Sequence, residues 1–132
     1  MSDFTKSRIS KSDSWATPKE VYDELDREFH FNFDPCPLNE HPEFGENGLL
    51  IEWGTRVFMN PPYSHPEPWV KRAYEQSLKG KLVVGLLRGD TSTNWFHNWV
   101  LGKAEIRFVR GRICFNDKPA PFASIIAIWG KP

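Results

Sequence analysis

The sequence carries no net charge, contains few cysteines and has no long hydrophobic segment. Its 132 residues carry 17 basic and 17 acidic side chains, so no overall basic field attracts nucleic acid. Two cysteines, Cys36 and Cys114, are too few for a disulfide framework and are typical of a reduced compartment. No apolar run approaches the roughly 20 residues that span a bilayer, and the polar N-terminus lacks the apolar core of a secretory signal. We therefore expect a cytoplasmic protein with no membrane contact.

A metal site is also not expected. The chain has four histidines, and Cys36 stands close to His41. No second Cys/His pair follows at the spacing that zinc fingers use. Any contact with phosphates would have to come from local basic groups, such as the segment that contains Arg107, Arg110 and Arg112.

Alternating helix and strand patterns predict one α/β domain over residues 14–132, preceded by a flexible polar tail over 1–13. Helices are predicted over 18–29, 68–78 and 93–101, the first capped by Thr17 with Pro18 at its first position. Strands are predicted over 29–33, 49–53, 56–59, 82–87, 105–109 and 125–129, with a short pairing segment at 113–115. We expect a mostly parallel sheet flanked by helices.

The tetrapeptide Asn60-Pro61-Pro62-Tyr63 directly follows the apolar run at 57–59 and predicts a rigid loop at the end of a buried strand. Asp34-Pro35 likewise follows a predicted strand. Because ligands gather at the carboxyl ends of parallel strands, we expect these two loops to form a single site.

The loop combines an amide, a backbone carbonyl fixed by proline and an aromatic ring. Such a set can hold both hydrogens of a planar amino group and stack on its face, which suits the amino group of a nucleobase or a glutamine amide. Two acceptors, the Asn60 side-chain oxygen and the Pro61 carbonyl, would localise the lone pair of an adenine amino nitrogen. Tyr63 would stack on a base swung out of the duplex. The same residues can also form an ordinary proline-stiffened turn.

Several segments resemble one family, in this order: Ser14-Trp15-Ala16-Thr17-Pro18, Asp34-Pro35-Cys36-Pro37, Phe58-Met59-Asn60-Pro61-Pro62-Tyr63-Ser64, Trp95-Phe96-His97 and the run 104–112. The chain is similar over 15–129 to the phage-type DNA N6-adenine methyltransferases, the Dam family. The resemblance implies a small Rossmann-like methyltransferase that uses S-adenosylmethionine and acts on double-stranded DNA, as a monomer or a homodimer.

The resemblance also implies residue roles. The catalytic loop would be Asn60, Pro61, Pro62 and Tyr63. Cofactor contacts would come from Trp15, Thr17 and Pro18 at the methionine end, and from Asp34, Pro35 and Cys36 after the first strand. The segment with Arg107, Arg110 and Arg112 would approach DNA.

The region expected to bind the cofactor is short, and Asp34-Pro35-Cys36-Pro37 stands where related methyltransferases have a glycine-rich turn. We expect Glu52, with Glu46 as the alternative, to hold the ribose hydroxyls. Two other functions stay open. One is methylation of RNA adenine or protein glutamine, and the other is nucleic-acid binding without catalysis.

Structural roles compete with several of these assignments. Thr17-Pro18 is also an ordinary helix start, and Asp34 before proline can form an Asx turn. We interpret Cys36 as a small packing residue rather than as a nucleophile. The arginines around position 110 can simply protect an exposed strand edge.

Overall fold

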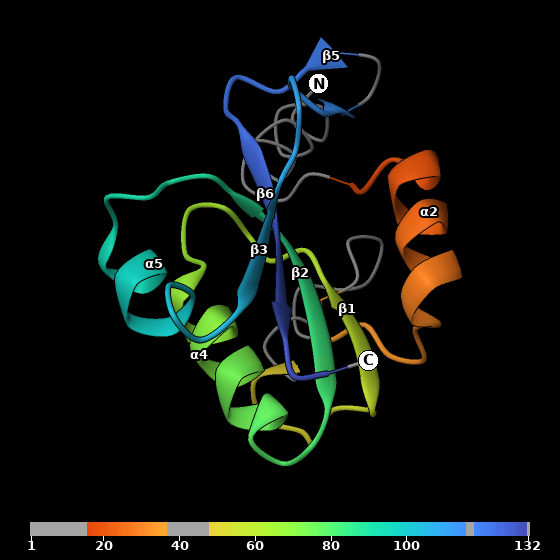
Figure 1. Ribbon diagram of the computed structural model, residues 1–132, viewed down its shortest axis with the longest axis vertical. Coiled ribbons are helices and arrows are strands. Elements are labelled where there is room, and N and C mark those ends of the chain that lie inside the picture. Colours follow the sequence, from red (N-terminus) through yellow and green to blue (C-terminus); the bar gives the residue numbers. More distant parts are fainter. Residues whose placement is uncertain (1–15, 37–47, 116–117, 132) are drawn as a thin grey trace, which may run out of the picture.

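One mixed sheet lies at the centre of the protein (Figure 1). The computed structural model describes residues 16–36, 48–115 and 118–131. Within them, β1 (Arg56–Met59), β2 (Leu82–Arg88), β6 (Ser124–Trp129) and β3 (Glu105–Phe108) are neighbours in the order β1-β2-β6-β3. β1 and β2 pair in parallel, and β6 is antiparallel to both β2 and β3. Three of these strands thus run in one direction and β6 runs against them.

The reversed strand β6 corrects the expectation of a mostly parallel sheet. Parallel neighbours need a long crossover connection, usually a helix. The described residues between β3 and β6 contain only a short hairpin, β4 (Cys114–Phe115) with β5 (Lys118–Pro119), so the chain returns in the opposite direction. The pairing segment predicted at 113–115 is confirmed by β4.

Helices cover both faces of the sheet. Helix α2 (Lys19–Phe29) lies on one face, and α4 (Glu67–Ser77) and α5 (Asn94–Trp99) lie on the other, as Figure 1 shows. Alternate side chains of each strand enter the two cores, as a period of two requires. The core beneath α4 and α5 takes Val57, Met59, Val83, Leu87, Ile125, Ala127 and Trp129. The core beneath α2 takes Phe58, Leu82, Val84, Leu86, Ile126 and Ile128.

The predicted strands at 29–33 and 49–53 are not formed. Helix α2 continues to Phe29, and His30 ends it in the left-handed conformation with φ of 56°. Only Phe33 then pairs, by an isolated parallel bridge to Val57. Residues 48–53 turn instead of extending, because the buried Trp53 donates its indole N–H to the Gly48 carbonyl at 2.6 Å while Leu50 and Ile51 stay exposed.

The other elements agree with the sequence within a few residues. β2 is the buried apolar strand expected at 82–87, and α4 and β3 begin and end within one residue of prediction. Helix α5 is shorter than the predicted 93–101, although Thr93 caps it by accepting the Phe96 N–H. Among the described residues, no helix is long and apolar enough to cross a membrane.

Candidate active site

The carboxyl ends of three neighbouring segments meet at one edge of the sheet. Phe58 donates its N–H to the Phe33 carbonyl at 3.0 Å, which fixes the parallel bridge beside β1. Since β1 and β2 are also parallel, Asp34, Asn60 and Arg88 stand at equivalent ends of their segments. The prediction that the Asp34 and Asn60 loops meet at one edge is confirmed.

Asn60 is held by residues distant in the sequence. Its side-chain Nδ2 donates to the Thr17 hydroxyl at 2.9 Å, in a partly buried position. Its backbone forms a hydrogen bond with the Cys36 side chain. Pro61, the next residue, is buried. The catalytic-loop candidate is therefore joined directly to both segments that the resemblance assigned to the cofactor.

Asp34 forms the Asx turn that its position before proline permits. Its Oδ1 accepts the Cys36 N–H at 2.9 Å. Although much of the residue is exposed, protein atoms displace water from the carboxyl and raise its pKa to about 6, while the bond from Cys36 opposes the shift. The surroundings of the Asp34 carboxyl therefore oppose its ionisation. A nearby cation would favour the charged form.

Cys36 is a packing residue rather than an activated nucleophile. Burial raises the pKa of its thiol well above the ordinary value, and the neighbouring Asp34 carboxylate raises it further. A nucleophilic cysteine needs the opposite shift. Pro35 beside it is buried, and its carbonyl lies against Gly48, where a Cβ would come within 2.0 Å of the Pro35 oxygen. Only glycine allows this close approach.

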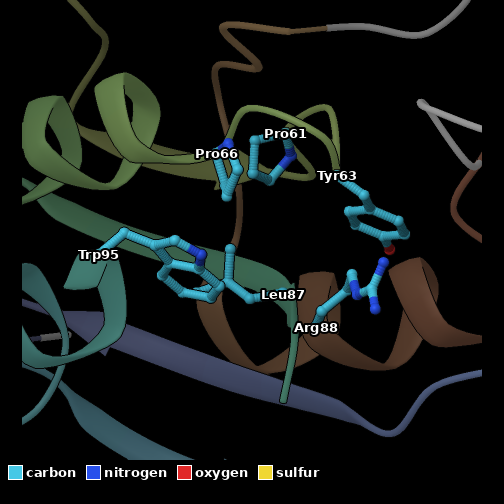
Figure 2. Close-up of a pocket in the computed structure, with 6 residues that line it drawn as sticks. All are labelled: Pro61, Tyr63, Pro66, Leu87, Arg88 and Trp95. Atoms are coloured by element: carbon cyan, nitrogen blue, oxygen red, sulfur yellow. The ribbon is translucent and has the colours of Figure 1, made fainter. Parts of the chain in front are cut away.

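Tyr63 lies in the core at the end of the loop, with 7% of its surface exposed. Its ring packs edge-on against Phe122, with centroids 4.9 Å apart. The Arg88 guanidinium lies over the Phe122 ring at 4.7 Å, and Figure 2 shows the Tyr63 hydroxyl pointing toward Arg88. Burial raises the pKa of Tyr63, so the hydroxyl stays protonated at neutral pH.

An apolar pocket opens beside the loop (Figure 2). It is lined by Pro61, Tyr63, Pro66, Leu87, Arg88 and Trp95. In this structure the pocket is too narrow to admit a water molecule. A planar ligand can enter only after the lining residues move apart.

Sequence reasoning did not select Leu87, Arg88 or Trp95 as site residues. The rule that placed Asn60 also applies to Leu87 and Arg88, because they end the parallel strand next to β1, whereas Trp95 comes from helix α5. Arg88 also lies beside the Asp90 carboxylate, with Nε to Oδ2 of 3.1 Å. The signal for Leu87 and Arg88 was therefore available in the apolar run at 82–87 and the arginine that follows it.

The structure separates the three candidate DNA-contacting arginines. Arg107 donates to both carboxylate oxygens of Glu28 at 2.7 and 2.8 Å and lies over the Phe29 ring. Arg110 and Arg112 are exposed beyond the end of β3, and Arg112 donates to the Ala120 carbonyl at 3.2 Å. Since β3 runs in the direction of β1 and β2, Arg110 and Arg112 follow strand ends at the edge of the candidate site. Arg107 is instead engaged in fixing α2 to the sheet.

Glu52 is not brought to the site. It is exposed and pairs with Lys79 at 3.0 Å and Lys81 at 2.7 Å, and these pairs hold the pKa of its carboxyl down at about 2. Lys81 immediately precedes β2, so Glu52 lies near the amino ends of the strands, opposite Asn60. This geometry does not support ribose binding by Glu52.

Pro18 is the N-cap residue of α2 and not its first helical residue, and Thr17 makes no capping bond because its hydroxyl contacts Asn60. Trp15, Glu46 and the tail at 1–13 lie outside the described residues. Within the described ranges, no three histidine, cysteine or acidic side chains are grouped as a metal site would require.

Comparisons with known proteins agree on one family. A family model described as DNA N-6-adenine-methyltransferase (Dam) matches residues 4–126. A protein named DNA N-6-adenine-methyltransferase from Haemophilus phage HP1 is 40% identical over 120 residues, which cover 80% of this chain and 68% of the relative. A protein of the same name from Escherichia phage T1 is 33% identical over 106 residues, covering 74% of this chain and 44% of the relative. No solved structure matches the chain.

Proposed function

Because the chain belongs to the DNA N-6-adenine-methyltransferase (Dam) family, we propose that it methylates the N6 amino group of adenine in double-stranded DNA. The methyl donor would be S-adenosylmethionine. The observation that carries the proposal is the placement of the Asn60-Pro61-Pro62-Tyr63 loop. It follows a parallel strand, contacts the Thr17 and Cys36 segments and lines the apolar pocket.

The first requirement is that the chain can hold a cationic donor beside Asn60. S-adenosylmethionine supplies a methyl group on a positively charged sulfur and carries an ammonium group. The Asp34 carboxyl, with its raised pKa, stands on the segment that contacts Asn60 and would become a favourable partner for such a cation. Pro18, Pro35 and Cys36 would complete the cofactor contacts, and the residues present therefore fit the group.

The second requirement is that the target nitrogen becomes nucleophilic. The Asn60 Oδ1 and the Pro61 carbonyl would each accept a hydrogen bond from the adenine amino group. Two such bonds favour a lone pair localised on the amino nitrogen. Proline fixes the backbone torsions around this carbonyl before the substrate arrives. This chemistry needs no metal ion, since the two acceptors act on the amino group directly.

The third requirement is a place for a base removed from the duplex. Aromatic stacking on a flipped base is worth about 1–3 kcal/mol. Tyr63 supplies the ring at the pocket, and Leu87 and Trp95 supply further apolar surface. Arg110 and Arg112 would meet the phosphate backbone at the same edge of the sheet. A shortened Rossmann-like arrangement of strands would place all these groups together.

The decisive experiment measures N6-methyladenine directly. Purified protein is incubated with labelled S-adenosylmethionine and unmethylated duplex DNA, and the DNA is digested to nucleosides for mass spectrometry. Asn60→Ala should reduce product by about 10²-fold or more, as expected when one preorganised polar group is removed, while cofactor affinity and melting temperature stay near those of wild type.

Asn32→Ala is the matched control. Asn32 also bonds a threonine hydroxyl and a backbone N–H, but at the amino end of β1 and away from the site. It should retain the wild-type rate. Product from RNA adenine or a glutamine amide, and none from DNA, would reassign the substrate. Failure of the wild type to bind the cofactor would instead support a nucleic-acid-binding protein without catalysis.

A further inference from the structure

The hydrogen bond between Asn60 and Thr17 joins two parts of the chain that lie 43 residues apart. Building on the proposed function, we propose that Thr17 is a positioning residue that fixes the Asn60 amide with its oxygen toward the adenine amino group. The resemblance to the family assigned Thr17 to the cofactor. The geometry assigns its hydroxyl a contact with the catalytic amide instead.

An asparagine side chain has two ends of nearly equal shape and opposite function. Its oxygen only accepts hydrogen bonds, and its nitrogen only donates them. The adenine amino group donates hydrogen bonds, so the oxygen of the Asn60 amide must face it. If the amide were turned around, its N–H groups would face the hydrogens of the adenine amino group, and neither bond could form.

The structure shows one of these two orientations at Thr17. Its Oγ1 accepts the Asn60 Nδ2 at 2.9 Å, so the nitrogen end is turned toward α2 and the oxygen end away from Thr17. A threonine hydroxyl can donate as well as accept. The role of this contact must therefore be tested by removing the hydroxyl while keeping the shape of the side chain.

Both partners rest on fixed elements, which is what positioning requires. Thr17 directly precedes Pro18, the N-cap residue of α2, and the Pro18 carbonyl accepts the Tyr22 N–H at 3.0 Å. Helix α2 is anchored to the sheet by the buried Leu25 and Phe29. Asn60 directly follows β1. The bond thus links the start of α2 to the end of β1 at the site.

The test uses Thr17→Val, which keeps the branched shape but loses the hydroxyl, and Thr17→Ser, which keeps the hydroxyl. Single-turnover methylation of duplex DNA, cofactor affinity by calorimetry and melting temperature are measured for each. We expect Thr17→Val to lower the single-turnover rate about tenfold to a hundredfold, since small misplacements of reacting groups have effects of this size. Cofactor affinity should stay within twofold of wild type, and Thr17→Ser should stay close to wild type in rate.

The chain provides a matched control for the loss of such a bond. Thr55 accepts the Asn32 Nδ2 at the same distance of 2.9 Å, near the amino end of β1. Thr55→Val removes the same type of bond and should leave the rate unchanged. If Thr17→Val unfolds at the assay temperature, Thr17→Ala replaces it with the same expected result.

A second readout does not depend on turnover. In protein with ¹⁵N-labelled asparagine, the side-chain amide signals of Asn60 are identified by their absence from Asn60→Ala. They should shift in Thr17→Val and stay in place in Thr55→Val.

The outcomes separate the inference from the proposed function. If the wild type is active and Thr17→Val has the same rate, the positioning role is overturned. The same holds if Thr17→Val binds the cofactor more weakly but keeps the wild-type rate. Unshifted Asn60 amide signals in Thr17→Val would also overturn it. A wild type that yields no N6-methyladenine would refute the proposed function, and the role of Thr17 with it.

Discussion

Replacing Tyr63 by phenylalanine tests how this ring contributes to the site. The tyrosine is 93% buried, with 7% of its surface exposed, and its hydroxyl has no hydrogen-bond partner among the described residues. The ring itself packs edge-on against Phe122. Phenylalanine keeps this ring contact and removes the hydroxyl alone. The change should therefore stabilise the protein.

The size of the effect follows from the state of the hydroxyl. A buried polar group without a partner costs about 1–3 kcal/mol, because it has lost its hydrogen bonds to water. For a chain of this length, each 1 kcal/mol shifts the melting temperature by about 3–5 °C. We expect Tyr63→Phe to raise the melting temperature by at least about 3 °C and to keep methyl transfer, since stacking on a base needs only the ring.

Calorimetric unfolding and the N6-methyladenine assay check both parts. Tyr63→Leu serves as the contrasting variant, because it loses the edge-on contact, worth about 0.5–1.5 kcal/mol, as well as the stacking surface. It should be less stable and at least about fivefold slower. Tyr22→Phe removes a hydroxyl from a partly exposed ring and should change neither quantity. A lower melting temperature or a lost activity in Tyr63→Phe would show that the hydroxyl has a partner, and would refute the reasoning.

Three other predictions concern charged side chains, two on Asp34 and one on the arginines. The pKa of Asp34 is raised to about 6 in the folded chain, so the folded state holds this proton more tightly than the unfolded state does. Stability from this group is therefore greatest below pH 4 and is lost as the pH rises toward 6, and Asp34→Asn should remove that part of the dependence of melting temperature on pH. If Asp34 pairs with the cationic cofactor, wild-type affinity should rise between pH 5 and 7 and Asp34→Asn affinity should stay constant, as calorimetry can determine. In DNA binding, Arg110→Ala should reduce the slope of log affinity against log salt concentration by about 1. Arg107→Ala should leave this slope unchanged. It should instead lower the melting temperature, because its bonds to Glu28 are lost. Equal slopes for Arg110→Ala and wild type would remove Arg110 from the DNA surface.

Much of the secondary structure and the centre of the site follow from local sequence. The apolar run of β2, the helical spacing of α4 and the prolines after β1 each act over a few residues, and they are formed where the sequence predicts them. The meeting of the Asp34 and Asn60 loops also followed from sequence, because parallel strands bring their carboxyl ends to one edge. Helix α2 begins at Lys19 rather than at Pro18, since Thr17 bonds Asn60 and does not cap the helix.

Tertiary structure alone decided which long-range partners each side chain has. The direction of β6 depends on the connection that precedes it, and its own continuous apolar run fits either direction. Arg107 lies 79 residues from Glu28, and Glu52 lies 29 residues from Lys81, so no local pattern indicated these pairs. The sequence by itself determined the chemistry of the loop, since that chemistry resides in adjacent residues. Packing of α2 against the sheet determined which end of the Asn60 amide is held by Thr17, because a hydrogen bond between distant segments exists only once the chain has folded.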